Sequence, residues 1–151
     1  ATSSYLSPPT YFSGGGGLVS SAADYLRFAQ MFINGGELDS ERLLSPRTVA
    51  YMSRNHLPGG KDLPALTTGS FSEVPFEGVG FGLGVAVRDN SVSSGVLSSK
   101  GELSWGGLAS THFWIDPRED LISIFLTQLI PSSSYNIRNE LRTLVYGALI
   151  D

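Results

Sequence analysis

The 151-residue chain is long enough for one domain with a hydrophobic core and too short for two ordinary ones. Hydrophobic residues make up 41% of it and charged residues 16%, a composition typical of a folded globular protein. A net charge of −4, with no run of Lys or Arg, gives no electrostatic basis for nucleic acid or an anionic membrane surface as a partner.

Two further classes of site are excluded by composition. The absence of cysteine excludes disulfides, thiolate metal ligands and a cysteine nucleophile. The two histidines, His56 and His112, lie far apart, and no motif joins them in a metal site. No apolar stretch is long enough to span a bilayer. We therefore expect no metal, no cofactor and no membrane span.

The helical part is predicted over residues 14–56. Its four glycines, Gly14–Gly17, lack the lysine of a phosphate loop and favour a tight backbone passage. A capping box at Ser21 and Asp24 starts the first helix, and Asn34-Gly35-Gly36 ends it. Its expected buried residues recur at helical spacing: Leu26, Phe28, Ala29, Phe32 and Ile33.

The second helix is expected from Pro46 to about Asn55, with Ser45 as its cap and a proline at its first position. We expect Val49 and Met52 on its buried side, with Tyr51 as a further candidate, and His56 exposed just beyond its end. Residues 57–79 then carry prolines and glycines that interrupt every period, which predicts a long loop.

Residues 80–151 are predicted to form a sheet and a C-terminal helix. Strands are expected at Gly80–Arg88, more weakly at Val96–Ser98, in the second half of Gly101–Pro117, and at Leu121–Gln128 with both faces covered. The last helix, about Tyr135–Ile150, should bury one stripe and expose another. The buried stripe is Ile137, Leu141, Leu144, Val145 and Ala148, and the outward side chains are Arg138, Glu140 and Arg142.

The fold class that follows is α+β, with residues 1–151 as one domain. We expect an antiparallel sheet of three to four strands, a C-terminal helix packed on it and two N-terminal helices.

The dipeptide Gly106-Gly107, directly after Trp105, is the most unusual feature of the sheet region. Two glycines weaken a strand, so either the backbone bends there or another molecule approaches it closely. The first alternative is a bulge or turn, and the second is a strand edge with free N–H groups for a substrate.

No complete catalytic set is recognisable from the residues alone. The chain contains no G-x-S-x-G, no S-x-x-K and no H-E-x-x-H. Carboxylates such as Glu102 and Asp116 are present, but none forms a convincing acid–base pair.

Four short motifs, in order, resemble the serine β-lactamase-related family of class C β-lactamases, D,D-peptidases and related carboxylesterases. They are Ser13–Phe28, Gly80–Gly84, Trp105–Gly107 and Phe113–Leu121. The resemblance runs from about Ser13 to the last helix. It implies a partial β-lactamase-like fold, the C-terminal part of such a hydrolase.

By this resemblance, Trp105-Gly106-Gly107 occupies the place of the family's Lys-Thr-Gly or His-x-Gly motif on the strand beside the active site. The N–H of Leu108 would then be one donor of the oxyanion hole, with the other on the nucleophilic serine. Since Trp105 replaces a cationic or histidine residue, a carboxylate anchor is lost, which favours neutral esters over penicillins.

The family's Ser-x-x-Lys and Tyr-x-Asn motifs are absent from the chain. Tyr5-Leu6-Ser7 has the spacing of the second motif but stands too close to the glycine run. We therefore expect no catalytic nucleophile in this chain. Three alternatives remain: a hydrolase fragment whose complete form acts on a small ester or amide, a non-enzymatic binding or assembly module, and an unrelated α+β domain.

The partners expected are the missing N-terminal part or a second copy of the chain. In the family, further strands lie beside the final strand. Without them Leu121–Gln128, which has no Lys or Pro, becomes an apolar edge that favours pairing between chains. We expect a twofold dimer.

Overall fold

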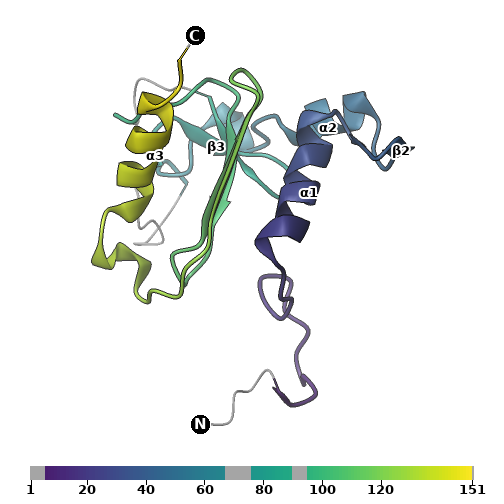
Figure 1. Cartoon of the computed structure of the whole chain (residues 1–151), viewed down its shortest axis with the longest axis vertical. Helices are drawn as coiled ribbons and strands as arrows, with labels where there is room; N and C mark the ends of the chain where they lie inside the picture. The colour runs from purple at the N-terminus through teal and green to yellow at the C-terminus, as the bar shows by residue number, and fades with distance from the viewer. Residues whose placement is uncertain (1–5, 67–75, 90–94, 151) are drawn as a thin grey trace.

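The computed structural model describes residues 6–66, 76–89 and 95–150. An antiparallel sheet of five strands lies between α3 (Ile137–Gly147) on one face and α1 (Ala22–Ile33) with α2 (Pro46–Met52) on the other (Figure 1). The α+β class, the two N-terminal helices and the C-terminal helix on the sheet are confirmed. The strands, in sheet order, are β3 (Val79–Phe81), β4 (Ala86–Arg88), β5 (Leu103–Gly106), β6 (His112–Asp116) and β7 (Leu121–Phe125).

Shorter elements complete the described fold. A two-stranded sheet of β1 (Glu37–Leu38) and β2 (Glu41–Arg42) follows α1, and two 3₁₀ turns are η2 (Pro58–Gly60) and η3 (Ser132–Ser134). No helix of the described ranges is long and apolar enough to cross a membrane. The predicted motif candidate at Tyr5 and residues 67–75 of the predicted loop lie outside the described residues.

Both predicted helix starts are confirmed. The Ser21 hydroxyl accepts a hydrogen bond from the Asp24 N–H at 3.1 Å, and Ser45 accepts one from the Thr48 N–H at 3.1 Å. The α1 helix ends where Gly36, with a φ of 96°, donates its N–H to the Met31 carbonyl at 2.8 Å. These ends depend on neighbours in the sequence, so the sequence predicts them well.

The α2 helix ends at Met52, three residues earlier than Asn55, because the Asn55 side chain bonds other segments. Its Oδ1 accepts the N–H of Leu57 at 3.0 Å and that of Phe81, in β3, at 3.2 Å. The expectation that His56 is exposed is wrong: it is half-buried, and its Nε2 lies 2.8 Å from the Tyr51 carbonyl oxygen.

The predicted strand Gly80–Arg88 is two strands, which makes the sheet one strand larger than expected. The chain reverses after β3, where the Gly82 N–H donates to the Val85 carbonyl at 2.8 Å and Gly84 has a φ of 95°. A Cβ on Gly82 would lie 2.1 Å from the Met52 carbonyl oxygen, so this backbone passes directly against α2. The weak strand predicted at Val96–Ser98 is wrong, because these residues form no strand.

The core lies between the sheet and α1 (Figure 1). The prediction for α1 is right for Ala29, Phe32 and Ile33 but wrong for Leu26 and Phe28, which are exposed. The β7 strand, predicted to have both faces covered, is half-buried at all five positions, because it forms the outer edge of the sheet. The buried core residues are Ala29, Met31, Phe32, Val49, Val85, Val87, Leu103, Phe113 and Ile115.

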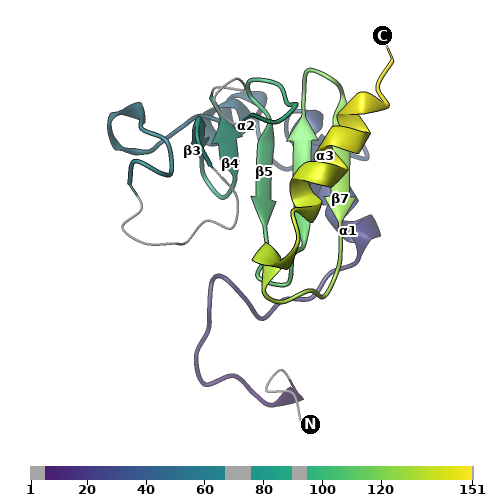
Figure 2. The same cartoon turned by 90° about the vertical axis from the view of Figure 1, so that its left-hand side faces the viewer.

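The α3 helix, which lies across the sheet in Figure 2, follows the predicted faces only in part. Ile137, Leu141 and Val145 are half-buried, and Glu140 is exposed as predicted. Arg138 and Arg142 are buried, whereas Leu144, predicted to be buried, is 72% exposed and Ala148 is exposed. The physical reason is the chemistry of the sheet beneath: Glu102 and Asp116 on that face are completely buried. Cations and hydrogen-bond donors must face them, since an unpaired buried carboxylate is costly.

Candidate active site

The paired strands β5 and β6 place alternate side chains on opposite faces of the sheet. Trp105 of β5 lies opposite Phe113 of β6, on the face that α1 covers. The Tyr25 ring of α1 contacts the Phe113 ring with centroids 5.0 Å apart. Trp105 is 36% exposed, and its ring contacts Phe81 of β3 at 4.9 Å. The Trp105 side chain therefore lies at the margin of the core.

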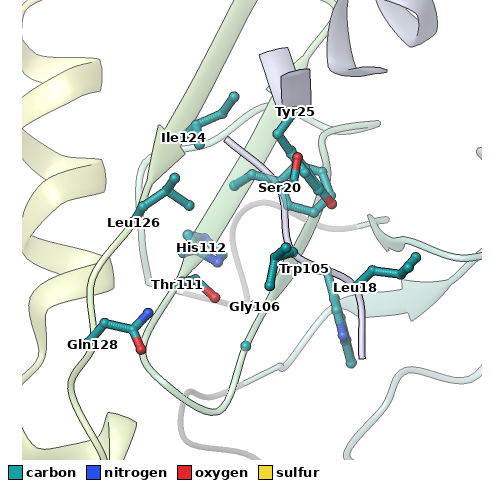
Figure 3. Close-up of a pocket in the computed structure, with 13 residues that line it drawn as sticks. Leu18, Ser20, Tyr25, Trp105, Gly106, Thr111, His112, Ile124, Leu126 and Gln128 are labelled. Atoms are coloured by element: carbon teal, nitrogen blue, oxygen red, sulfur yellow. The ribbon is translucent and has the colours of Figure 1, made fainter. Parts of the chain in front are cut away.

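A cavity of about 450 Å³ opens beside Trp105 (Figure 3). Its walls come from the segment before α1, from α1 itself, from the β5–β6 connection and from the end of β7. None of the described residues that line it carries a charged side chain. The lining residues are Leu18, Val19, Ser20, Tyr25, Trp105, Gly106, Gly107, Thr111, His112, Phe113, Ile124, Leu126 and Gln128.

The connection between β5 and β6, Gly107–Thr111, is a tight bend. The Gly107 N–H donates to the Thr111 carbonyl at 2.9 Å, and the Ser110 N–H donates to the Gly107 carbonyl at 3.1 Å. Ser110 has a φ of 67°, and its hydroxyl donates to the Leu129 carbonyl at 2.7 Å. Between these bonded residues, Leu108 is 73% exposed, and its N–H has no hydrogen-bond partner among the described residues.

Both glycines of the dipeptide are in close contact with other residues of the chain. A Cβ on Gly106 would lie 2.9 Å from the guanidinium carbon of Arg138, and one on Gly107 would lie 2.3 Å from the Thr111 hydroxyl. The bend, which was one of the two alternatives from the sequence, therefore occurs here, and the groups that approach the two glycines closely are side chains of this chain itself.

The comparison with known proteins identifies the family. The family model described as Beta-lactamase matches residues 1–147. The chain belongs to the beta-lactamase family. Protein Rv1367c of Mycobacterium tuberculosis (strain H37Rv) is 37% identical over 134 residues, which are 86% of this chain and 32% of that protein. The chain thus spans about a third of the length of the relatives that it matches.

Solved structures of this fold agree. EstCE1, a hydrolase with promiscuous acyltransferase activity, is 29% identical to this chain, with a TM-score of 0.70. The matched region covers 89% of this chain and 32% of the EstCE1 chain. The LovD6 mutant of simvastatin synthase from Aspergillus terreus is 20% identical to this chain, with a TM-score of 0.63. The matched region covers 84% of this chain and 33% of the synthase chain, and at this identity the likeness is one of fold alone. The resemblance to the serine β-lactamase-related family that the sequence motifs indicated is confirmed.

Within this family fold, the cavity is adjacent to a histidine that stays neutral. His112 of β6 lines the cavity, and its Nε2 lies 3.4 Å from an Nη of Arg142. Burial lowers the pKa of His112 to about 3, with further lowering by the positive charges of Arg142, Arg138 and Arg88. At neutral pH the cavity wall therefore carries no charge from this residue.

Behind the sheet, between it and α3, lies a network of buried charges that the sequence analysis missed. Glu102 pairs with Arg142 of α3 and lies 3.6 Å from the Nε of Arg88. The Tyr146 hydroxyl lies 3.0 Å from Glu102 and 2.6 Å from Asp116, so it bridges the two carboxylates. Burial, together with these carboxylates, raises the pKa of Tyr146. The guanidinium of Arg142 also lies 4.7 Å from the centre of the Trp114 ring.

A sequence signal for this network existed in the spacing of Arg138, Arg142 and Tyr146. Residues four apart lie on the same side of a helix, so these three share one face of α3. The apolar residues of the same helix predict a different face, because an arginine is rarely buried without a partner. No group of three or more His, Asp or Glu side chains among the described residues could bind a metal ion.

Proposed function

We propose that this chain supplies the substrate-side strand of a serine ester hydrolase or acyltransferase, with the N–H of Leu108 as one oxyanion donor. The nucleophilic serine would come from a polypeptide segment outside these 151 residues. The observation that carries the proposal is the cavity beside Trp105-Gly106-Gly107, which ends next to the exposed residue Leu108, whose N–H has no partner among the described residues.

In the acyl-transfer step, the serine oxygen would attack the ester carbonyl, and negative charge would develop on the carbonyl oxygen. The N–H of Leu108 and the N–H of the serine would donate to that oxygen. Two such donors stabilise the transition state by several kcal/mol because they are oriented before the reaction. The chain's contribution is therefore the binding of the substrate backbone and of the oxyanion.

The lining of the cavity favours neutral, apolar substrates. Trp105, Phe113 and Leu126 supply apolar surface, and the described lining residues include no Lys or Arg that could bind a substrate carboxylate. EstCE1, a hydrolase with promiscuous acyltransferase activity, supports this reaction class. Penicillin-like substrates, which carry a carboxylate, are therefore less suitable than small or bulky neutral esters.

The 151-residue chain alone should not hydrolyse p-nitrophenyl acetate or nitrocefin. A serine becomes a nucleophile only beside a base, and the chain contains neither Ser-x-x-Lys nor a Ser–His–carboxylate set. The assay compares the chain with the polypeptide that is isolated from cells and contains this sequence. Mass spectrometry establishes the length and sequence of that polypeptide. A longer polypeptide with Ser-x-x-Lys and ester turnover supports the proposal. Turnover by the chain alone that Ser20→Ala abolishes contradicts it, since Ser20 is the serine of the cavity lining.

The second candidate is a non-enzymatic module that assembles through its sheet. The observation that favours it is the position of β7, which pairs with β6 on one side and forms the sheet edge on the other. Leu126, next along the chain, is 51% exposed. An apolar edge without Lys or Pro is a template for pairing with a second chain.

This assembly predicts a dimer at tens of micromolar in analytical ultracentrifugation, a range typical of weak association. Leu126→Lys places a charge beside the edge and should shift the chain toward monomer. The matched variant Leu144→Lys alters another exposed leucine, on α3, and should leave the dimer intact. A monomeric wild-type chain at these concentrations contradicts edge pairing. A dimer that only Leu144→Lys dissociates would assign the contact to α3 instead.

A further inference from the structure

Arg138 is the buried residue of α3 closest to the β5–β6 bend. Its side chain lies on the face of the sheet opposite to Trp105, and the residue is 9% exposed. Its Nη2 donates to the Gly107 carbonyl at 2.8 Å and to the Thr111 carbonyl at 3.1 Å. These carbonyls belong to the first and last residues of the bend. One cation therefore joins the two ends of the connection.

The same two carbonyls accept the hydrogen bonds within the bend. The Thr111 carbonyl accepts the N–H of Gly107, and the Gly107 carbonyl accepts the N–H of Ser110. Each of these oxygens therefore has two donors, and the charge-assisted bonds of the guanidinium hold both carbonyls in the positions in which they accept the N–H groups. Removal of Arg138 would thus loosen the whole bend, in addition to removing the two hydrogen bonds that Arg138 donates to it.

Gly106 gives independent support for a close fit between Arg138 and the strand. The distance of 2.9 Å between a Cβ on Gly106 and the Arg138 guanidinium carbon is shorter than side chains normally approach. Any other residue at position 106 would displace the guanidinium. Arginine is also suited to this place, because its planar group can donate to two acceptors at once, whereas lysine acts as a point charge.

We propose that Arg138 is a positioning residue: from behind the sheet it fixes the Gly107–Thr111 bend, and with it the orientation of the Leu108 N–H. It does not touch the substrate. Its catalytic consequence rests on the proposed function, whereas its effect on the bend does not. Through the bend, α3 would control the geometry of the oxyanion donor.

Amide hydrogen exchange of Gly107 and Ser110, measured by NMR on the 151-residue chain, tests the structural part. Arg138→Ala should accelerate exchange of both amides by about tenfold or more, after correction for any change in the rate of exchange through global unfolding. The exchange rates of Arg138→Lys should lie between those of the wild type and of Arg138→Ala. Gly106→Ala should have the same effect, and the double variant Gly106→Ala with Arg138→Ala should add little to either. If Arg138→Ala does not fold, Arg138→Lys and Gly106→Ala carry the test.

Tyr146→Phe is the matched control, because it removes contacts of the same α3 face at Glu102 and Asp116, away from the bend. Exchange at Gly107 and Ser110 should stay within about twofold of wild type in this variant. Equal acceleration by Tyr146→Phe and Arg138→Ala would overturn the proposal. So would unchanged exchange in the Arg138 variants.

Kinetics of the longer hydrolase separate positioning from general stability. Arg138→Ala should lower kcat by about tenfold to a hundredfold with KM little changed, since a displaced donor costs transition-state binding. Added guanidinium ion should restore part of kcat. A changed KM with normal kcat contradicts a positioning role. Faster exchange in the bend, with no esterase activity in any longer polypeptide, would refute the proposed function and support the effect of Arg138 on the bend.

Discussion

Replacing Glu102 with alanine is expected to lower the free energy of unfolding by about 3–5 kcal/mol. Glu102 is completely buried and is the partner of Arg142, with Arg88 3.6 Å away and the Tyr146 hydroxyl at 3.0 Å. Without this carboxylate, two buried guanidinium groups lose their counter-charge. Urea denaturation followed by circular dichroism measures the change.

Two matched variants separate this effect from the loss of a side chain. Glu102→Gln keeps the shape and an acceptor for Tyr146 but removes the charge, and it should still be strongly destabilised. Glu37→Ala removes the partner of Arg42 from an ion pair at the surface, where side chains are 46% and 41% exposed, and should cost about 1 kcal/mol or less. Equal costs for Glu102→Ala and Glu37→Ala would contradict the assignment of a buried network.

Acid should destabilise the chain through His112 over the range between pH 6.5 and about pH 3. Burial lowers the folded-state pKa of His112 from 6.5 to about 3, so in this range the unfolded chain binds a proton that the folded chain does not. The contribution of His112 to stability is complete above pH 6.5 and is lost as pH falls toward 3. Each pH unit of the window corresponds to about 1.4 kcal/mol at most.

Two measurements test the prediction that protonation of His112 destabilises the chain in acid. NMR titration of the His112 ring should show a neutral imidazole at pH 5. Urea denaturation of His112→Asn from pH 7 to pH 4 should give a shallower loss of stability than wild type, because the variant has no imidazole to protonate on unfolding. A His112 ring that titrates near pH 6.5 would show that Arg142, Arg138 and burial do not act on it as the structure indicates.

The starts of α1 and α2 and the end of α1 were predictable because each depends on a few adjacent residues. Ser21 with Asp24 and Ser45 with Thr48 form their caps as expected, and the left-handed glycines end α1 as expected. The hairpin of β6 and β7 was likewise predictable, since the polar turn between them is local.

The faces of the elements were harder to predict. An apolar stripe predicted that Leu144 and Ala148 of α3 are buried, but α3 instead presents Arg138, Arg142 and Tyr146 to the sheet. A periodic pattern identifies two faces of a helix without identifying the surface opposite either of them. Only pairing across some 30 to 44 residues of sequence, as between Tyr146 and its carboxylate partners Asp116 and Glu102, decided which face is buried.

At the candidate site, the sequence by itself determined that Trp105, Gly106 and Gly107 form an unusual strand end, since two glycines cannot stabilise a strand. The tertiary structure decided what surrounds that end. The cavity requires the segment before α1, the β5–β6 bend and β7 together, and Arg138 reaches the bend from 31 residues away in sequence. Local propensity depends on neighbours along the chain, whereas cavities and buried ion pairs form between segments that only folding brings together.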